Sequence, residues 1–486
     1  MNALARWSVR HAAGLERVYR WGARWAPRLA PLARGLGLAR SERWLRPLER
    51  AGKGLLFDCR MCGQCVLGHT GMACPMNCAK QLRNGPCGGV RADGGCEVKP
   101  QMRCVWLEAG DGQRRAGSVA APWLAPLDRR RSERSTWIQV IQPEPGAAPV
   151  TQAAPPDIRP KAPPVEPVSA FDAALQDALR GQGFAVTVEI APPDSPDPAV
   201  LLARAERFRG LVDAINITDG AGGNCHMSSV AAASVLVAAG FEPVCQVGCR
   251  DRNRIAVQGD VLGAAALGVR NVLCLTGDDV SQGDHPQAKP VFDLDAVNLL
   301  GVLQGMTARG TYASGRPLEQ APRLFLGATA NPFVPPFVDR VDNLERKIDA
   351  GARFIQTQFC FDLDRLRAFL DEACRRGLHR RAALLIGVGT LPSAKGLKWM
   401  AEHVPGVAVP DAVITRIAAA EDQRAEGRRV CIETIHALQR LEGVAGIHLM
   451  GHRNEATLAQ VIVEAGLRSP PSSPLSNPLI SPSTAS

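Results

Sequence analysis

A regular alternation of short apolar runs and amphipathic segments occupies residues 169–468 of the 486-residue chain. Eight runs have the length and composition of buried strands, and each is followed by apolar residues at helical spacing, as in Leu201, Ala205 and Phe208. The predicted strands are Phe184–Ile190, Asp213–Thr218, Pro243–Gly248, Asn271–Thr276, Arg323–Thr329, Arg353–Gln358, Ala383–Val388 and Ala445–Met450. Eight consecutive βα units predict an α/β protein with a (β/α)8 TIM barrel, and a doubly wound open sheet is the alternative.

Polar side chains end or follow several of these strands. They are Glu189, Thr218, Gln246, Asp278 in the run NVLCLTGDD, Asn331 and Gln358. Because the loops at the carboxyl ends of barrel strands build the active site, we expect these groups to converge on one mouth. Each acid alone has a structural alternative, since it can cap the next helix.

A basic pair, Arg346 and Lys347, lies on the helical segment before the sixth strand, one turn after Asn343. A phosphate or pyrophosphate near the mouth would suit this pair. A solvated helical face is the alternative.

The segments outside the barrel differ from it in composition. Residues 1–50 hold eleven Arg against three Glu, so 11 − 3 = +8 of the formal charge of +10 is local, which predicts a basic helical arm and no nucleic-acid binding. An organelle transit peptide has a similar composition. Residues 120–168 predict a Pro/Ala-rich linker in which Trp137–Ile141 is a candidate for docking, and residues 469–486 predict a disordered tail.

Eight of the fifteen cysteines cluster in a predicted small domain at residues 51–119: Cys59, Cys62, Cys65, Cys74, Cys78, Cys87, Cys96 and Cys104. The run CRMCGQC followed by Cys74-Pro75 is typical of iron–sulfur ligation, whereas structural zinc prefers paired CxxC knuckles. We expect an iron–sulfur cluster, with Cys59, Cys62, Cys65 and Cys74 as the first set. Zinc and disulfides are the alternatives. The clustering, with no signal peptide or apolar run long enough for a membrane span, predicts a cytoplasmic protein.

Several motifs resemble the methylenetetrahydrofolate reductase family, whose members use flavin to reduce the methylene group on tetrahydrofolate. They are VEIAPP (188–193), NIT-G (216–220), CLTGD (274–278), NLERKIDAGA (343–352) and TQFCFD (357–362). GMACPMNCAK, LRNGPCGGV and CEVKP resemble the cysteine-rich domain found with some bacterial members, which is associated with iron–sulfur clusters.

The resemblance implies roles by position. Glu189 matches the acid that protonates N10 of the folate, through a pKa that partial burial would raise, and Asp278 matches the carboxylate that steadies developing positive charge. Gln358 matches an amide that binds both substrates in turn. Arg453 matches an arginine that closes the folate site, although Asn454 aligns about as well.

The resemblance also implies flavin or nicotinamide contacts. They fall at Thr218, Ala221, Gln246, Thr276, Gly277, Asp278, Asn331, Asn343, Arg346 and Lys347. The chain departs from the family pattern at Asp219, Gln246, Thr276 and Asn331, so FMN stays an alternative to the expected FAD.

The implied function is reduction of 5,10-methylenetetrahydrofolate to 5-methyltetrahydrofolate for methionine synthesis, or the reverse oxidation in one-carbon catabolism. NAD(P)H or an electron-carrier protein would supply the electrons, and a homo-oligomer is possible. A flavin-free pterin-binding methyltransferase and a non-catalytic, cluster-carrying electron-transfer subunit are the alternatives.

Overall fold

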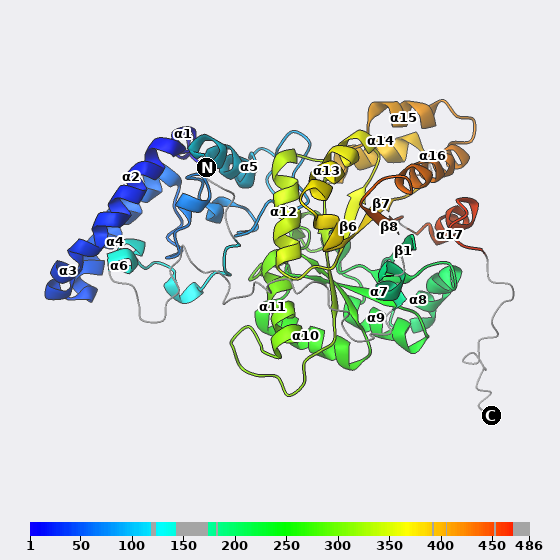
Figure 1. The fold of residues 1–486 in the computed structure, drawn as a ribbon, viewed down its shortest axis with the longest axis horizontal. Coiled ribbons are helices and arrows are strands. Elements are labelled where there is room, and N and C mark those ends of the chain that lie inside the picture. Colours follow the sequence, from blue (N-terminus) through cyan, green and yellow to red (C-terminus); the bar gives the residue numbers. More distant parts are fainter. Residues whose placement is uncertain are drawn as a thin grey trace.

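The computed structural model describes residues 1–117, 123–141, 174–180, 183–390, 393–404, 406–451 and 453–469. Figure 1 shows a barrel wrapped by helices and, beside it, a cysteine-rich segment from which a hairpin of helices projects. The expected tail beyond residue 469 and residues 142–168 of the expected linker lie outside the described residues. None of the described helices combines the length and the apolar character that crossing a bilayer requires.

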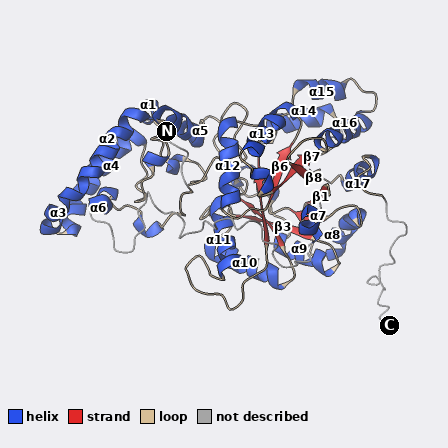
Figure 2. Ribbon diagram, in the orientation of Figure 1, coloured by secondary structure: helices blue, strands red, loops and turns tan. Residues whose placement is uncertain are grey.

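Eight parallel strands close into a barrel in sequence order, which confirms the predicted (β/α)8 fold (Figure 2). The strands are β1 (Ala185–Ile190), β2 (Ala214–Ile217), β3 (Pro243–Gly248), β4 (Asn271–Leu275), β5 (Phe325–Ala330), β6 (Phe354–Phe359), β7 (Ala383–Val388) and β8 (Val444–Leu449). β1 pairs with β8 at the closure, where a Cβ on Gly446 would lie 2.2 Å from the carbonyl oxygen of Ala185. Only glycine therefore fits this point of closure.

Helices surround the barrel and bury their apolar faces against it, as Leu299, Leu300 and Leu303 do. They are α7 (Ala174–Arg180), α8 (Pro198–Ala205), α9 (Ser229–Ala238), α10 (Arg254–Ala266), α11 (Ala296–Arg309), α12 (Phe337–Asp349), α13 (Leu363–Arg375), α14 (Ala394–His403), α15 (Asp411–Ala418), α16 (Gln423–Leu438) and α17 (Glu455–Glu464). Polar side chains just after strands cap several of them, for example Asn253 on α10 and Asp362 on α13.

The barrel interior is layered. At the end where the strands begin, an apolar cluster includes Leu175 of α7, Ala185, Leu273, Phe354 and Leu385. The next layer toward the carboxyl ends of the strands is polar and buried; it contains Thr187, Asn216, Gln356 and His448. The apolar cluster closes one end of the barrel, so the chemistry is confined to the other end, the mouth.

The N-terminal residues form a helical arm of α1 (Ala3–Arg10), α2 (Ala12–Trp25), the 3-10 turn η1 (Ala26–Leu29), α3 (Ala30–Leu36) and α4 (Leu38–Phe57). The cysteine-rich segment, residues 58–117, is mostly loop and ends in α5 (Val105–Ala116). α5 packs against α1 and α2. α4 runs seven residues past the predicted end of the arm at residue 50, so it joins the two parts directly.

Residues 123–141 fall within the expected linker but are packed. The indole N–H of Trp123 donates to Oδ1 of Asn298 at 2.7 Å, and Leu124 is buried. The helix α6 (Thr136–Ile141) docks on the arm, where Lys53 of α4 donates to the Thr136 hydroxyl at 2.6 Å. Residues 123–141 are therefore packed on the barrel and the arm, within a stretch for which the sequence predicts a linker with a docked Trp137–Ile141.

Candidate functional site

Glu189, on β1, lies on the mouth side of the polar layer and is about one-third exposed. The amide of Gln246 on β3 donates to its Oε2 at 3.2 Å, and Nε2 of His448 on β8 lies 3.8 Å from the same oxygen. Three strands thus hold one carboxyl group in a fixed position. Such an arrangement suits a group that gives or takes a proton at a bound heterocycle.

A chain of polar contacts runs inward from Glu189. Nδ1 of His448 lies 3.0 Å from the Thr187 hydroxyl, and the amide of Gln356 donates to that hydroxyl at 3.4 Å. Gln356 and Asn216 exchange hydrogen bonds at 2.6 and 3.0 Å. None of these four residues is among the site residues predicted from the sequence. The available signal was a polar residue on the inward face of an otherwise apolar strand, two positions from Glu189 in the case of Thr187.

Asp278 is exposed in the loop after β4, on the same face of the barrel as Glu189. The backbone N–H of Gly222, in the loop after β2, donates to its Oδ2 at 2.8 Å. The preceding Gly277 has φ of +93°, and a Cβ there would lie 2.9 Å from the Cβ of Arg250. The loop therefore needs glycine at this position to turn Asp278 toward the β2 loop.

The cysteine-rich segment reaches the same loop. Lys80, a buried residue, forms an ion pair with Glu97 of its own segment and donates to the carbonyl oxygen of Gly277 at 2.7 Å. The carbonyl that receives this bond belongs to the residue before Asp278. No local sequence pattern predicts this contact, because Lys80 and Gly277 are 197 positions apart.

The two predicted substrate-binding residues lie elsewhere on the rim. Gln358 is half-buried on β6, and its Oε1 accepts from the backbone N–H of Phe359 at 3.0 Å. Arg453 is exposed, and its charge, after the hydrogen bond from His226, helps to lower the pKa of Asp194 in the loop after β1. Asn454, the alternative to Arg453, donates to the Thr390 hydroxyl at 2.9 Å. Arg453 is therefore the better candidate for the residue that closes the folate site.

The predicted phosphate grip is partly buried and contacts the cysteine-rich segment. Nη2 of Arg346 donates to the carbonyl oxygen of Gly85 at 3.2 Å, and the amide of Asn331 donates to that of Gly88 at 2.9 Å. Lys347 donates to the carbonyl oxygen of Thr329 at 2.6 Å. Burial, followed by the charges of nearby arginines, lowers the pKa of Lys347 to about 8. The solvated-face alternative for this pair is therefore wrong.

The remaining predicted cofactor residues are partly engaged. Thr276 accepts from the N–H of Ala296 at 3.3 Å, whereas the buried hydroxyl of Thr218 and the buried amide nitrogen of Asn343 have no hydrogen-bond partner among the described residues. Ala221 lies exposed in the turn after β2. Asp219, one of the departures from the family pattern, is held by Arg252 at 2.6 Å.

These contacts define how far the site fits a flavin. The unpaired Thr218 hydroxyl, Gln246 and Asp278 leave polar groups at the mouth for a ring system. The groups expected to hold the phosphates are taken by backbone carbonyls of Gly85, Gly88 and Thr329. The donor set at the mouth suits the polar edge of a ring system, whereas the side chains expected to hold a pyrophosphate are already paired.

All fifteen cysteines lie among the described residues, and each is a free thiol there. A cavity in the cysteine-rich segment is lined by the first expected set, Cys59, Cys62, Cys65 and Cys74. Burial, together with the charges of Cys59, Cys62 and Cys65, raises the pKa of Cys74 to about 12. These four side chains therefore form one group.

The other four thiols form a second group. Burial raises the pKa of Cys78 to about 12, with contributions from Cys104 and Cys96. The pKa of Cys87 is raised by burial and by neighbours that include Cys104 and Cys78.

Among the described residues, the one trio of metal-binding atoms within 4.8 Å of one another is Cys374, His379 and Glu442, outside this segment. Tetrahedral zinc with Zn–S bonds of about 2.3 Å would hold its sulfurs closer than this limit. A cluster whose thiolates bind different irons spaces them more widely.

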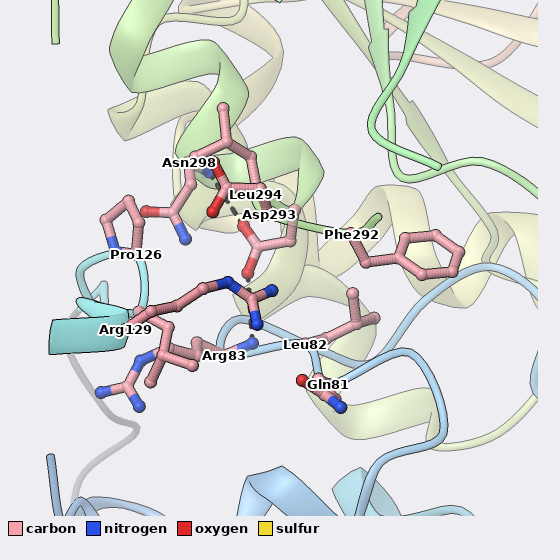
Figure 3. Close-up of a pocket in the computed structure, with 11 residues that line it drawn as sticks. Gln81, Leu82, Arg83, Pro126, Arg129, Phe292, Asp293, Leu294 and Asn298 are labelled. Atoms are coloured by element: carbon pink, nitrogen blue, oxygen red, sulfur yellow. Dashed lines mark hydrogen bonds between the residues drawn. The ribbon is translucent and has the colours of Figure 1, made fainter. Parts of the chain in front are cut away.

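Figure 3 shows a further cavity, at the junction of the cysteine-rich segment, residues 126–129 and the barrel loop before α11. Beside it, the N–H groups of Arg83 and Asn84 donate to Oδ2 of buried Asp295 at 3.3 and 2.9 Å. Burial raises the pKa of Asp295, and these bonds oppose the rise. No predicted site residue lines this cavity, which belongs to the joint between the two parts.

Comparisons with known proteins agree with this architecture. A family model described as "Methylenetetrahydrofolate reductase" matches residues 174–466, and one described as "Methylene-tetrahydrofolate reductase C terminal" matches residues 38–121. A "Probable methylenetetrahydrofolate reductase (NADPH)" from Caenorhabditis elegans is 22% identical over 249 residues, which cover 49% of this chain and 34% of that protein. The chain thus spans about a third of the length of this curated relative.

Solved structures resemble the chain more distantly. An uncharacterized protein from Clostridium thermocellum that binds two copies of 5-methyl-5,6,7,8-tetrahydrofolic acid is 15% identical, with a TM-score of 0.44, over 60% of this chain and 99% of its own. A 2,3-dimethylmalate lyase is 14% identical, with a TM-score of 0.34, over 61% of this chain and 85% of its own. At these scores neither structure bears on function. The first family model covers more than half of the sequence, and the chain belongs to the methylenetetrahydrofolate reductase family.

Proposed function

We propose that the protein interconverts 5,10-methylenetetrahydrofolate and 5-methyltetrahydrofolate at the barrel mouth. The observation that carries the proposal is the position of Glu189, held by Gln246 and His448 at the open end of a barrel whose other end is filled with apolar side chains. Family membership supports the same reaction.

In this proposal each chain residue has a separate task. Glu189 gives a proton to N10 of the folate as the methylene bridge opens to an iminium, and Gln246 keeps the carboxyl group aimed at that nitrogen. Asp278, anchored by Gly222, stabilises the developing cation through its negative charge. Gln358 and Arg453, on the rim, hold the edge and the acidic tail of the folate.

A bound flavin would supply the hydride. Thr218, Gln246, Gly277 and Asp278 are the groups that would hold its ring. Arg346 and Asn331 already donate to backbone carbonyls, so they are not available to phosphate groups. This favours FMN, or FAD with its phosphates placed elsewhere, over FAD held through those side chains. Electrons would come from NAD(P)H or, through the cysteine-rich segment, from a carrier protein.

Glu189→Gln tests the assignment. The variant should keep the barrel folded and lose about 10²- to 10⁴-fold in the rate of the folate half-reaction. Reduction of bound flavin by the electron donor should stay unchanged. Glu206→Gln, at an exposed site outside the barrel, is the matched control. Equal losses in both half-reactions, or an unchanged folate rate, would contradict the assigned role.

We also propose that the two thiol groups bind two iron–sulfur clusters, the first through Cys59, Cys62, Cys65 and Cys74 and the second through Cys78, Cys87, Cys96 and Cys104. The cavity lined by the first group and the shared burial of the second support this division. Cys62→Ser and Cys87→Ser should each lose about half of the iron per chain, with Cys225→Ser, at an exposed thiol outside the cysteine-rich segment, as control. Full iron in either of the first two variants, or complete loss in both, contradicts two independent sites.

The occupied groups at Asn331 and Arg346 also favour a second candidate, a pterin-binding methyltransferase that needs no flavin. Flavin released on heating the purified protein separates the two. A protein that holds clusters but no flavin, and that transfers a methyl group from 5-methyltetrahydrofolate, would replace the reductase proposal.

A further inference from the structure

The helical arm exposes far more apolar surface than the rest of the molecule. Of the eighteen large apolar side chains that are exposed among the described residues, ten lie on α1 to α4 and η1. They are Leu4, Trp7, Val18, Trp21, Trp25, Leu29, Leu36, Trp44, Leu48 and Leu55. Single exposed apolar residues are ordinary, but a concentration of this kind marks a binding surface.

These side chains form stripes. On α2, Val18, Trp21 and Trp25 follow one another at spacings of three and four residues and are 65%, 65% and 47% exposed. On α4, Trp44, Leu48 and Leu55 occupy one face and are 77%, 63% and 60% exposed. Residues at these spacings share one side of a helix. Each helix therefore has a solvent-facing apolar stripe in addition to the face that it buries.

The exposed charges of the arm are positive. Arg17, Arg20 and Arg24 lie beside the stripe of α2, and all three are exposed. The acids of the arm are engaged: Glu16 is buried, Glu49 is buried against Lys53 and the Ser135 hydroxyl, and half-buried Glu42 accepts from the N–H of Ser135. On α4, Arg43 and Arg46 are exposed, whereas Arg50 forms an ion pair with Glu133.

We propose that the arm binds the surface of an anionic membrane. Trp and Leu side chains at the stripes would enter the boundary between headgroups and acyl chains, while the flanking arginines contact lipid phosphates. Helices with this distribution of Arg, Trp and Leu lie in the plane of the interface and do not cross it.

Two other occupants fit less well. A second copy of the arm would bring arginine-rich surfaces together, which repel. An acidic redox protein would have to dock close to the thiol groups. In Figure 1 the hairpin of α2 and α4 carries α3 away from both the cysteine-rich segment and the barrel. Trp25, Leu29, Leu36 and Trp44 lie toward that far end, and α4, with its 20 residues, extends about 30 Å.

The test is flotation of the full-length, cluster-loaded protein with vesicles. Vesicles of phosphatidylglycerol and phosphatidylcholine are compared with vesicles of phosphatidylcholine alone. We expect the protein to float with the anionic vesicles only, to be released at about 0.5 M salt, and to show a blue shift of tryptophan fluorescence when bound. The assay uses no folate, so its result is independent of the proposed reaction.

Two variants locate the surface. Trp21→Ala with Trp25→Ala should weaken binding at least about tenfold, whereas Trp399→Ala, at an exposed tryptophan of the barrel, should leave it unchanged. Changing Arg17, Arg20 and Arg24 to Glu should abolish flotation. The same change at the exposed barrel residues Arg207, Arg380 and Arg440 should not.

Sedimentation, circular dichroism and iron content show whether each variant is folded. No flotation of the wild type with anionic vesicles would overturn the proposal, as would arm variants that float like the wild type. A dimer in light scattering that Trp21→Ala with Trp25→Ala dissociates, without vesicle binding, would overturn it in favour of a second copy. Saturable binding of an acidic ferredoxin at the arm, again without vesicle binding, would overturn it in favour of a protein partner.

Discussion

Lys347 is a partly buried cation, and the one hydrogen bond of its ammonium among the described residues is to a neutral carbonyl, that of Thr329. Its pKa falls from 10.5 to about 8, mainly because burial penalises the charged amine. At pH 7 the Lys347 amine is charged in both states, and the charged form is less stable in the folded protein than in the unfolded chain. The shift corresponds to about 3 kcal/mol of lost stability. Between pH 8 and 10.5 the unfolded chain binds more protons than the folded one, so this loss disappears as pH rises.

Replacement of Lys347 by Met keeps the side-chain volume and removes the charge. It also removes the bond to Thr329, which contributes about 1 kcal/mol at any pH. The variant should therefore be more stable than the wild type by about 2 kcal/mol at pH 7 and less stable by about 1 kcal/mol near pH 10.5. The difference between the two proteins should change sign within that interval.

Guanidinium unfolding at a series of pH values measures this difference. Thiols and other groups that titrate in the same interval cancel, because both proteins carry them. Lys398→Met, on the exposed face of α14, should give a difference that does not depend on pH. A constant difference between wild type and the Lys347 variant from pH 7 to 10 would refute the assignment of a buried, destabilising charge.

Two further substitutions probe the joint and the barrel. Lys80→Met breaks a buried ion pair and leaves Glu97 without its partner, so it should lower the free energy of unfolding by about 3–5 kcal/mol. Exposed Lys99→Met should change it by less than about 0.5 kcal/mol. An equal effect of both would show that the pair is not buried. Gly327→Ala would place a Cβ 2.2 Å from the ring of Phe354 and should destabilise the barrel by about 1–3 kcal/mol. Gly259→Ala on the exposed face of α10 meets no atom within 4 Å and should be neutral or slightly stabilising, so a tolerated change at Gly327 would mean that the ring moves aside.

The sequence by itself determined the barrel and several of its rim residues. Strand-length apolar runs such as Pro243–Gly248 and Ala383–Val388 indicate strands that are buried on both faces. Their bounds agree with β3 and β7. Glu189 was identifiable because it is one of several polar side chains that end or follow the predicted strands. The grouping of cysteines was equally local, since ligands of one site lie close together in the chain.

Tertiary structure alone decided which predicted groups are available. Arg346 and Gly85 are 261 positions apart, and Asn331 and Gly88 are 243 apart. No local sequence pattern can therefore predict that these donors bind carbonyls of the cysteine-rich segment. The proximity of His448 to Glu189 likewise exists only because β8 pairs with β1 at the closure of the barrel. Periodicity reflects the burial of each residue relative to its neighbours in the chain. The partner of a buried polar group is set by how whole elements dock, and short-range pattern holds no information about that docking.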